Sequence, residues 1–304
     1  MAILIRDKFL AYQRECEERF STLKQNEEEL NRIFIEIYGL QDELTPEVED
    51  KDVTVRRADE GREIRSLLSY SVGCMFGRYS LDVKGLVYAG GEWDAGKYKS
   101  FLPCKDNVLV IPDEADYLED DIVARFVEFI RIVYGEETVA DNLRYISEVL
   151  GTSGNTSREK IRNYFLKDFY SNHVRIYQKR PIYWLFDSGR ENSFKALIYL
   201  HRYTADTVGK VRADYLLKLQ ASYKNQLEAA KKIIEEQGGN ERNQAKKRES
   251  KLVKQLNEIK DYDTKLYHIA TERIELDLDD GVKVNYEKLQ TDRNGKKYEI
   301  LGRF

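Results

Sequence analysis

Basic and aromatic side chains alternate along one stretch of the chain, from Arg158 to Arg202. Guanidinium and ammonium groups neutralise phosphates, and aromatic rings among them supply apolar packing, so this mixture is suited to nucleic-acid binding. A solvated basic face over an aromatic core would have the same composition, and none of the established DNA-binding motifs is present. The candidate DNA-contacting residues are Arg158, Arg162, Lys167, Arg175, Lys179, Arg180, Arg190, Lys195 and Arg202.

Charge is unevenly distributed along the chain, and an excess of basic residues that could form a cationic surface occurs mainly in this stretch. The 304 residues carry a formal net charge of −4, so the chain has no general attraction to polyanions. Residues 106–148 contain twelve carboxylates against three arginines, whereas residues 158–218 contain thirteen basic residues against six acidic ones. If one surface of the molecule is cationic, the second of these stretches must build it.

Closely spaced glycines, which phosphate-cradling and dinucleotide-binding loops need, are missing. Only a backbone without Cβ atoms can approach a pyrophosphate, and such loops place two glycines two residues apart. None of the 18 glycines has that spacing, so every G-x-G motif is excluded. The nearest approach to it, Gly73 with Gly77, lies in an apolar helical context and predicts close helix packing instead.

Carboxylate and histidine chemistry is only weakly indicated. A nuclease site of the PD-(D/E)xK type would use Pro112-Asp113, but residues 114–150 contain no lysine, so that motif is incomplete. We expect a solvated acidic loop and a helix cap there, with a divalent-ion site as the alternative. Among the dispersed histidines only His201 is a candidate general base, and a structural or phosphate-contacting role is favoured for it.

Cysteine spacing and hydropathy restrict the class of protein. The three cysteines are far apart and form no C-x-x-C pair, so the sequence predicts neither a disulfide framework nor a zinc site. No run of about 18 apolar residues is present, and residues 1–6 lack the features of a signal peptide. We therefore expect a cytoplasmic protein that has no membrane partner.

Apolar periodicity predicts a chain made mainly of helices. Gly39 is well placed to end the first of them, and Thr156 with Glu159 has the spacing of a capping box at the start of a later one. That later helix is expected to carry the apolar pattern through Phe169. The other predicted helices, one of which could be two, span residues 7–38, 64–76, 120–134 and 137–150.

A small β component is predicted beside the helices. The β-branched and aromatic run 181–186 and the apolar run 194–203 flank a turn at residues 187–189, which is typical of a β-hairpin. Glycines and prolines divide residues 86–111 into short apolar runs, where we expect small strands or ordered loop.

The longest periodic signal is a helical hairpin. Apolar residues recur at seven-residue spacing over residues 211–237 and again over 243–274, and Gly238-Gly239-Asn240 separates the two runs. Such a pattern predicts an antiparallel coiled coil, which can serve as a spacer, clamp or partner surface. Its seam residues are Leu216, Leu219, Tyr223, Ala230 and Ile233 in the first helix and Leu252, Leu256, Ile259, Leu266 and Ala270 in the second.

We therefore predict a mainly α fold with a small β component, an α+β protein. Four regions are expected in chain order. They are N-terminal helices with an acidic loop (1–60), a mixed α/β recognition region (61–204), the coiled-coil hairpin (205–275) and a polar C-terminal tail (276–304).

Several long strings resemble a known family, in the same order and over nearly the whole chain. They are NEEELNRIF (26–34), YGL (38–40), SYSVGCMFGRYSLD (69–82), KRPIYWLFDSG (179–189), KALIYLHRY (195–203) and LDLDDGVKVNY (276–286). In these strings the chain resembles the C-terminal part of the adenine-specific DNA methyltransferases of BREX phage-defence systems, the PglX family. Those enzymes are themselves similar to single-chain restriction-modification enzymes.

The resemblance implies N6-adenine methylation of DNA with S-adenosylmethionine, used to mark self DNA. The family's catalytic motif is Asn-Pro-Pro-Tyr/Phe, whereas the four prolines here follow Thr45, Leu102, Ile111 and Arg180. We therefore expect the catalytic core to lie upstream of this chain. S-adenosylmethionine is expected for the parent enzyme, and no catalytic, cofactor or metal residue can be carried over.

Three hypotheses follow. The first is a DNA-recognition and scaffold region, in which the basic stretch contacts double-stranded DNA while the coil braces the DNA or a partner. The second is a protein-interaction module, in which the coil and acidic residues 106–148 dock other defence-system proteins. The third and least favoured is a stand-alone hydrolase that uses His201.

Overall fold

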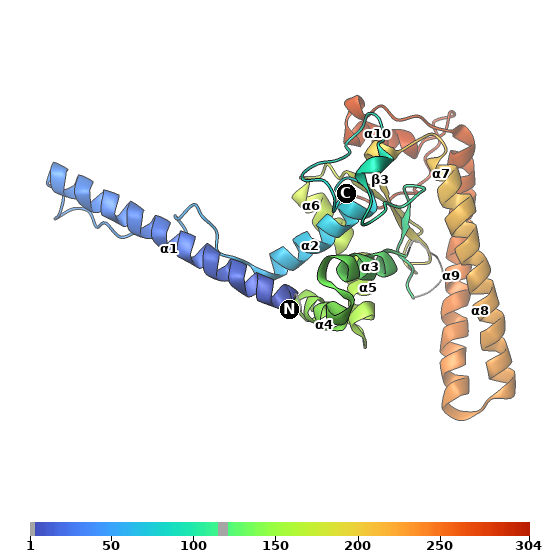
Figure 1. Cartoon of the computed structure of the whole chain (residues 1–304). Helices are drawn as coiled ribbons and strands as arrows, with labels where there is room; N and C mark the ends of the chain where they lie inside the picture. The colour runs from blue at the N-terminus through green and yellow to red at the C-terminus, as the bar shows by residue number, and fades with distance from the viewer. Residues whose placement is uncertain (1–3, 115–120) are drawn as a thin grey trace.

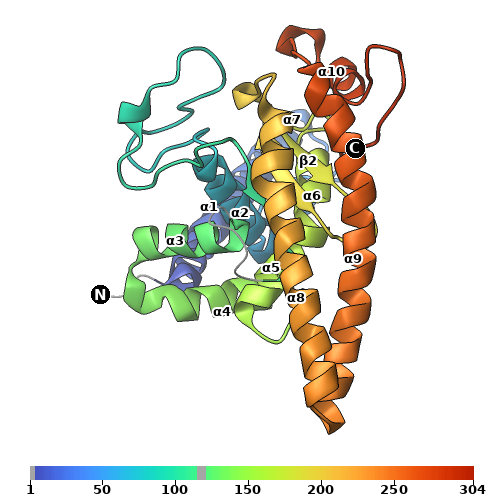
Figure 2. The same cartoon turned by 90° about the vertical axis from the view of Figure 1, so that its right-hand side faces the viewer.

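A three-stranded antiparallel sheet lies between helices on both sides (Figures 1 and 2). The computed structural model describes residues 4–114 and 121–304. The strands β1 (Leu109–Val110), β2 (Tyr183–Asp187) and β3 (Lys195–Tyr199) have the order β1–β3–β2. Because β2 and β3 pair as neighbours in sequence, the predicted β-hairpin is confirmed, as is the mainly α fold with a small β component.

Five helices form the body on one side of the sheet. They are α2 (Glu60–Met75), α3 (Ile122–Tyr134), α4 (Val139–Leu150), α5 (Ser157–Lys167) and α6 (Phe169–Ile176). The capping box of Thr156 and Glu159 is present at the start of α5. The helix expected to continue through Phe169 is instead broken at Asp168, and the separate helix α6 buries both Phe169 and Tyr170.

Gly73 and Gly77 are closely packed, but against the rings of the loop residues Tyr79 and Trp93 rather than against another helix as predicted. A Cβ atom on Gly73 would lie 2.4 Å from the Tyr79 ring, and one on Gly77 would lie 2.5 Å from the Trp93 ring. Both distances are shorter than the non-bonded contacts that Cβ atoms make in proteins, so only glycine lets these rings approach the backbone.

On the other side of the sheet lies the helical hairpin (Figure 2). A short helix α7 (Thr207–Lys210) and a π-helical turn (Val211–Leu216) lead into α8 (Leu217–Glu236), which is followed by α9 (Gly239–Glu272). The second helix begins at Gly239 rather than at residue 243 as predicted, because Gln237 and Gly238 suffice for the turn. The seam residues Leu216, Leu219 and Tyr223 are completely buried, whereas Leu256 and Ala270 are only partly buried and Ile233 near the tip is 41% exposed.

Side chains of the strands alternate between the two helical layers, as the pleat of a sheet requires. Leu185 and Leu197 belong to the core shared with α2–α6. Trp184, Phe186 and Ile198 belong to the core shared with the hairpin. The sheet therefore couples the hairpin to the body through two cores.

A 34-residue helix, α1 (Ile5–Tyr38), projects from the body as an arm (Figure 1). At its base the backbone N–H of Ile5 donates to Asn142 of α4 at 2.8 Å. Gly39, with φ of 67°, ends the helix as predicted, and the chain returns along it. Lys24 holds the returning segment through an ion pair with Asp50 at 2.7 Å.

The C-terminal residues pack against the sheet although their composition is polar. Helix α10 (Val282–Leu289) buries Leu289, and Ile300 is completely buried. The backbone N–H of Gly302 donates to the carbonyl of Leu185 in β2 at 2.7 Å. The few apolar residues of this segment thus complete the core on the hairpin side.

Candidate nucleic-acid interface

Helix α2 carries cationic side chains beside its buried face. Ile64 and Leu68 are four residues apart and buried, which anchors the helix to the body. Arg62, Arg65 and Ser69, at three- and four-residue spacing, share a neighbouring face. The sequence analysis missed these arginines because they precede the basic stretch, although their helical spacing was readable.

Helix α6 supplies the facing wall. It buries Phe169 and His173 and leaves Arg175 and Ile176 exposed, Ile176 to 62%. The walls enclose a pocket of about 220 Å³, which we call the basic pocket. Its residues are Arg62, Arg65, Ser66, Ser69, Tyr164, Phe169, Asn172, His173, Arg175 and Ile176.

The guanidinium groups of the basic pocket differ in their partners. Arg62 is paired with Glu63 at 2.8 Å, and Arg175 donates to the amide oxygen of Asn172 at 2.8 Å. Burial raises the pKa of the Tyr164 hydroxyl, whereas Asn172 and the charges of Arg65 and Arg175 oppose that rise. No carboxylate of the described residues forms an ion pair with Arg65 or Arg175, so both can receive an anion.

His173 fixes the position of α6 relative to the sheet. Its Nε2 atom accepts hydrogen bonds from the backbone N–H groups of Ile182 and Tyr183, at 3.2 and 3.1 Å. Burial lowers the pKa of His173 to about 3, with a smaller effect of Arg78, so the imidazole is neutral near pH 7. This histidine therefore positions the pocket and contributes no charge to it.

A cationic turn follows α6 directly. Gln178 and Lys179 both adopt positive φ, 50° and 61°, which is uncommon for residues other than glycine. Backbone hydrogen bonds from Lys179 to Val174 and from Arg180 to Tyr177 hold the turn, at 2.9 and 2.8 Å. Lys179 and Arg180 are exposed, so the turn extends the positive charge beyond Arg175.

Arg162, one of the predicted DNA contacts, lies inside the protein. Its guanidinium pairs with Asp121 at 2.6 Å and donates to the carbonyl of Pro112 at 3.1 Å. The side chains of Arg162 and Asp121 are only 7% and 3% exposed. Arg162 therefore stabilises the core and cannot reach a phosphate.

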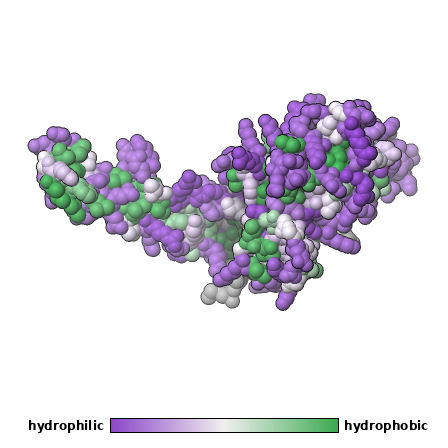
Figure 3. Space-filling model, turned by 90° about the horizontal axis from the view of Figure 1, so that it is seen from above, coloured by the Kyte–Doolittle hydropathy of each residue, from purple (hydrophilic) through white to green (hydrophobic). Residues whose placement is uncertain are grey.

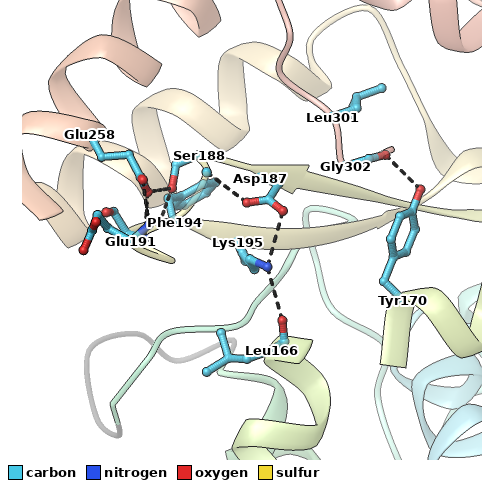
Figure 4. Close-up of polar contacts among 12 residues, drawn as sticks. Leu166, Tyr170, Asp187, Ser188, Glu191, Phe194, Lys195, Glu258, Leu301 and Gly302 are labelled. Atoms are coloured by element: carbon cyan, nitrogen blue, oxygen red, sulfur yellow. Dashed lines mark hydrogen bonds and ion pairs between the residues drawn. The ribbon is translucent and has the colours of Figure 1, made fainter. Parts of the chain in front are cut away.

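Lys195 and Arg202 also make internal contacts. Lys195 pairs with Asp187 at 3.3 Å and donates to the carbonyl of Leu166 at 3.2 Å (Figure 4). Arg202 donates to backbone carbonyls, including that of Cys104 at 2.9 Å, and its guanidinium lies 4.3 Å from the Trp93 ring centre. Lys195 thus links β3 to α5 and β2, Arg202 holds the loop that contains Cys104, and both side chains are removed from the candidate interface.

Arg158, Lys167 and Arg190, the remaining predicted contacts, are exposed. None of the three lines the basic pocket. Arg190 lies in the β2–β3 turn, which Glu258 of α9 holds by accepting from Ser188 at 2.7 Å and from the backbone of Glu191 at 2.8 Å (Figure 4). The exposed cations thus occupy several places, and only Arg175 of the predicted set enters the pocket.

Two carboxylates of the acidic stretch make internal ion pairs, whereas Glu136, Glu137, Asp141 and Glu148 are exposed. Asp121 is buried against Arg162, and Asp113 is 8% exposed and pairs with Lys251 of α9 at 2.5 Å. Residues 115–120, part of the predicted acidic loop, lie outside the described residues. Among the described residues, no group of three His, Cys, Asp or Glu side chains could hold a metal ion.

His201, the candidate general base, is half-buried. Its ring centre lies 4.9 Å from that of Tyr199, and its carbonyl accepts from the Tyr88 hydroxyl at 3.1 Å. Burial lowers the pKa of His201, and Arg78 lowers it further. These contacts attach the 86–94 loop to the sheet, which is a structural role.

No helix of the described segments is long and apolar enough to cross a membrane.

Two known proteins are similar to this chain. It is 51% identical over 288 residues to "Adenine-specific methyltransferase PglX" of Lacticaseibacillus casei (strain Zhang), a match covering 93% of the chain and 24% of that protein. It is 39% identical over 293 residues to "Adenine-specific methyltransferase BrxX" of Escherichia coli O9:H4 (strain HS), covering 86% of the chain and 24% of that protein. The chain thus spans about a quarter of the length of these relatives. No family model matches it. The resemblance to the PglX family is confirmed.

Proposed function

Because the chain is related to adenine-specific methyltransferases of the PglX type, and spans about a quarter of their length, we propose that it is a DNA-gripping region of such an enzyme. In this proposal the chain holds duplex DNA and another part of the enzyme methylates adenine. The wider role is the marking of self DNA in phage defence.

One observation carries the proposal: arginines distant in sequence converge on the basic pocket. Arg62 and Arg65 come from α2 and Arg175 from α6, about 110 residues later, and the exposed Lys179 and Arg180 follow directly. Arginine forks match phosphate geometry, and neutralising DNA phosphates releases counterions. The pocket and the turn together are suited to several neighbouring phosphates.

Catalysis and cofactor binding are assigned to the rest of the enzyme. Methyltransferases of this kind use S-adenosylmethionine, and this chain has neither the Asn-Pro-Pro-Tyr/Phe motif nor a G-x-G loop. In the proposal the grip keeps the duplex in place while an adenine is rotated out of the helix, which costs a few kcal/mol of stacking and pairing.

The test is duplex-DNA binding at several salt concentrations, measured by fluorescence anisotropy. We expect the triple variant Arg175→Ala, Lys179→Ala, Arg180→Ala to bind more weakly and to lose about 0.9 from the slope of log affinity against log salt for each contact removed. Arg65→Ala should add to this loss, because Arg65 lines the same pocket.

A matched control removes three exposed lysines from other elements, Lys260 of α9 and Lys283 and Lys288 of α10. It changes the net charge equally and should leave the affinity nearly unchanged. Equal losses in the two triple variants would mean that only net charge matters. Unchanged affinity of the folded pocket variant would reject the proposed interface.

A further inference from the structure

The free end of the arm exposes an apolar surface, which we call the arm tip. Leu30, Ile33, Phe34, Ile37 and Tyr38 recur at three- and four-residue spacing on α1, and Leu44 follows the Gly39 turn. Ile37 and Tyr38 are 68% and 70% exposed, and the other four are 43% to 54% exposed. Figure 3 shows apolar residues gathered at the end of the projecting arm.

The lower part of the same helix is covered by the chain itself. Cys16 and Phe20 are 5% and 4% exposed, and the Arg57 guanidinium lies 3.9 Å from the centre of the Phe20 ring. The returning segment also buries Val53. Toward the tip the returning segment still contacts the helix, through Pro46 and Val48, and Ile35 is 8% exposed, but Ile37 and Tyr38 remain largely exposed.

The arm tip has the shape of a docking element. Apolar residues at i, i+3, i+4 and i+7 form the face that an amphipathic helix lays into a groove. Beside this face is a hollow of about 250 Å³, lined by Phe34, Ile35, Tyr38, Leu40 and Leu44 together with Asn31 and Thr45. The tip thus offers both a ridge and a hollow to an occupant.

Charge around the tip restricts the chemistry of that occupant. Residues 24–52 carry ten carboxylates against three cations, Lys24, Arg32 and Lys51. This excess repels DNA, anionic lipid headgroups and the same arm of a second copy. A surface that combines apolar residues with lysine and arginine would be attracted.

The arm carries the tip away from the body of the protein (Figure 1). The 34 residues of α1 place the tip about 50 Å from the base of the arm.

We propose that the arm tip is a docking helix for a separate protein whose apolar groove is edged with lysine and arginine side chains. The contact is independent of the basic pocket, so one chain can hold DNA and this partner at the same time.

The first experiment finds the occupant by site-specific crosslinking. The photoreactive amino acid p-benzoylphenylalanine replaces Ile37 in the full chain, within the cell that encodes it. A matched probe replaces Val284 of α10, which is 55% exposed on the body. We expect the Ile37 probe alone to capture a separate protein, through a peptide that contains apolar residues and an excess of lysine and arginine.

The second experiment measures the contact with purified components. The captured protein is titrated with the chain and with the double variants Phe34→Ser, Ile37→Ser and Asp42→Lys, Glu43→Lys. The first should weaken binding at least tenfold, and the second should weaken it and reduce its salt dependence. Both variants should bind duplex DNA no more weakly than the unchanged chain, which separates this proposal from the proposed DNA grip.

Several outcomes would overturn the proposal. They are capture of a second copy, of another part of the same polypeptide, of nucleic acid or of an acidic peptide. The proposal would also be overturned by equal capture with the Val284 probe or by the absence of any photoproduct. Unchanged affinity of the Phe34→Ser, Ile37→Ser variant would overturn it as well.

Discussion

The helical hairpin and the arm are both long projecting elements with apolar residues at helical spacing. The apolar face of the hairpin is buried, whereas that of the arm tip is exposed. In the hairpin, Tyr223, Leu252 and Ile259 are completely buried. In the arm, Ile37 and Tyr38 stay more than two-thirds exposed. The hairpin carries its own second helix in the sequence, whereas the arm is followed only by an irregular segment, which contacts the tip half of α1 through Pro46 and Val48 but leaves Ile37 and Tyr38 exposed.

This difference shows what an apolar repeat does and does not determine. The repeat predicts which face of a helix is apolar, but it does not identify the surface that packs against that face. Hydrophobic burial is non-directional, so any complementary apolar surface will serve. The same apolar residue types therefore serve both folding stability and partner recognition. Only the residues that surround an apolar face in the folded protein show which of the two it serves.

The largest expected effect is in the hairpin seam. Leu252→Ala removes a completely buried side chain and should lower the free energy of unfolding by about 2 to 5 kcal/mol, measured by urea denaturation. The matched control is Val253→Ala, the next residue on α9, which is 42% exposed. Similar losses in both variants would contradict the assignment of the seam.

A smaller effect is expected where the hairpin meets the body. Asp113 accepts from Tyr223 at 2.8 Å and from Gln255 at 2.9 Å, and it pairs with Lys251. Burial opposes its charge, but Lys251 and these two donors hold its pKa below the usual value. Asp113→Asn should cost about 1 to 3 kcal/mol at neutral pH, as expected for hydrogen bonds to a charged group.

The pH dependence of stability tests the same contact. Because the folded-state pKa of Asp113 is lowered, its contribution is complete above about pH 4, the ordinary aspartate range, and is lost as pH falls through the folded value. Asp113→Asn should flatten the acid side of the stability curve. Asp50 of the arm, whose pKa Lys24 and Arg57 lower to about 2, is the control. It is solvent-exposed, so Asp50→Asn should leave the melting temperature nearly unchanged.

The smallest effect is expected at the arm tip. Phe34→Ser, Ile37→Ser should change the free energy of unfolding of the isolated chain by no more than about 0.5 kcal/mol, because both side chains are more than half exposed. A loss of 2 kcal/mol or more would mean that this chain already packs the tip, and the contrast with the hairpin would fail.

Prediction from sequence succeeded where the signal is local. The capping box at Thr156, the end of α1 at Gly39 and the β2–β3 hairpin all formed. Each depends on residues close in the chain, whose geometry is set by neighbouring backbone hydrogen bonds and steric limits. The PglX-type strings were likewise readable without a structure.

Prediction of the interface was less complete because it assumed that the basic residues between Arg158 and Arg202 all face the same surface. Arg162, Lys195 and Arg202 meet buried or half-buried partners, while Arg62 and Arg65 join the pocket from a distant helix. An arginine looks the same in the sequence whether its guanidinium binds a phosphate or pairs with Asp121. Only its neighbours decide which.

The sequence by itself determined the helical elements, the hairpin, the uneven charge and the kinship of this chain. The tertiary structure alone decided which cations remain free, which face of the arm remains uncovered, and that a three-stranded sheet joins the hairpin to the body. The reason is physical. Secondary structure follows from interactions within a few residues, whereas burial and pairing depend on which distant segments the fold brings into contact.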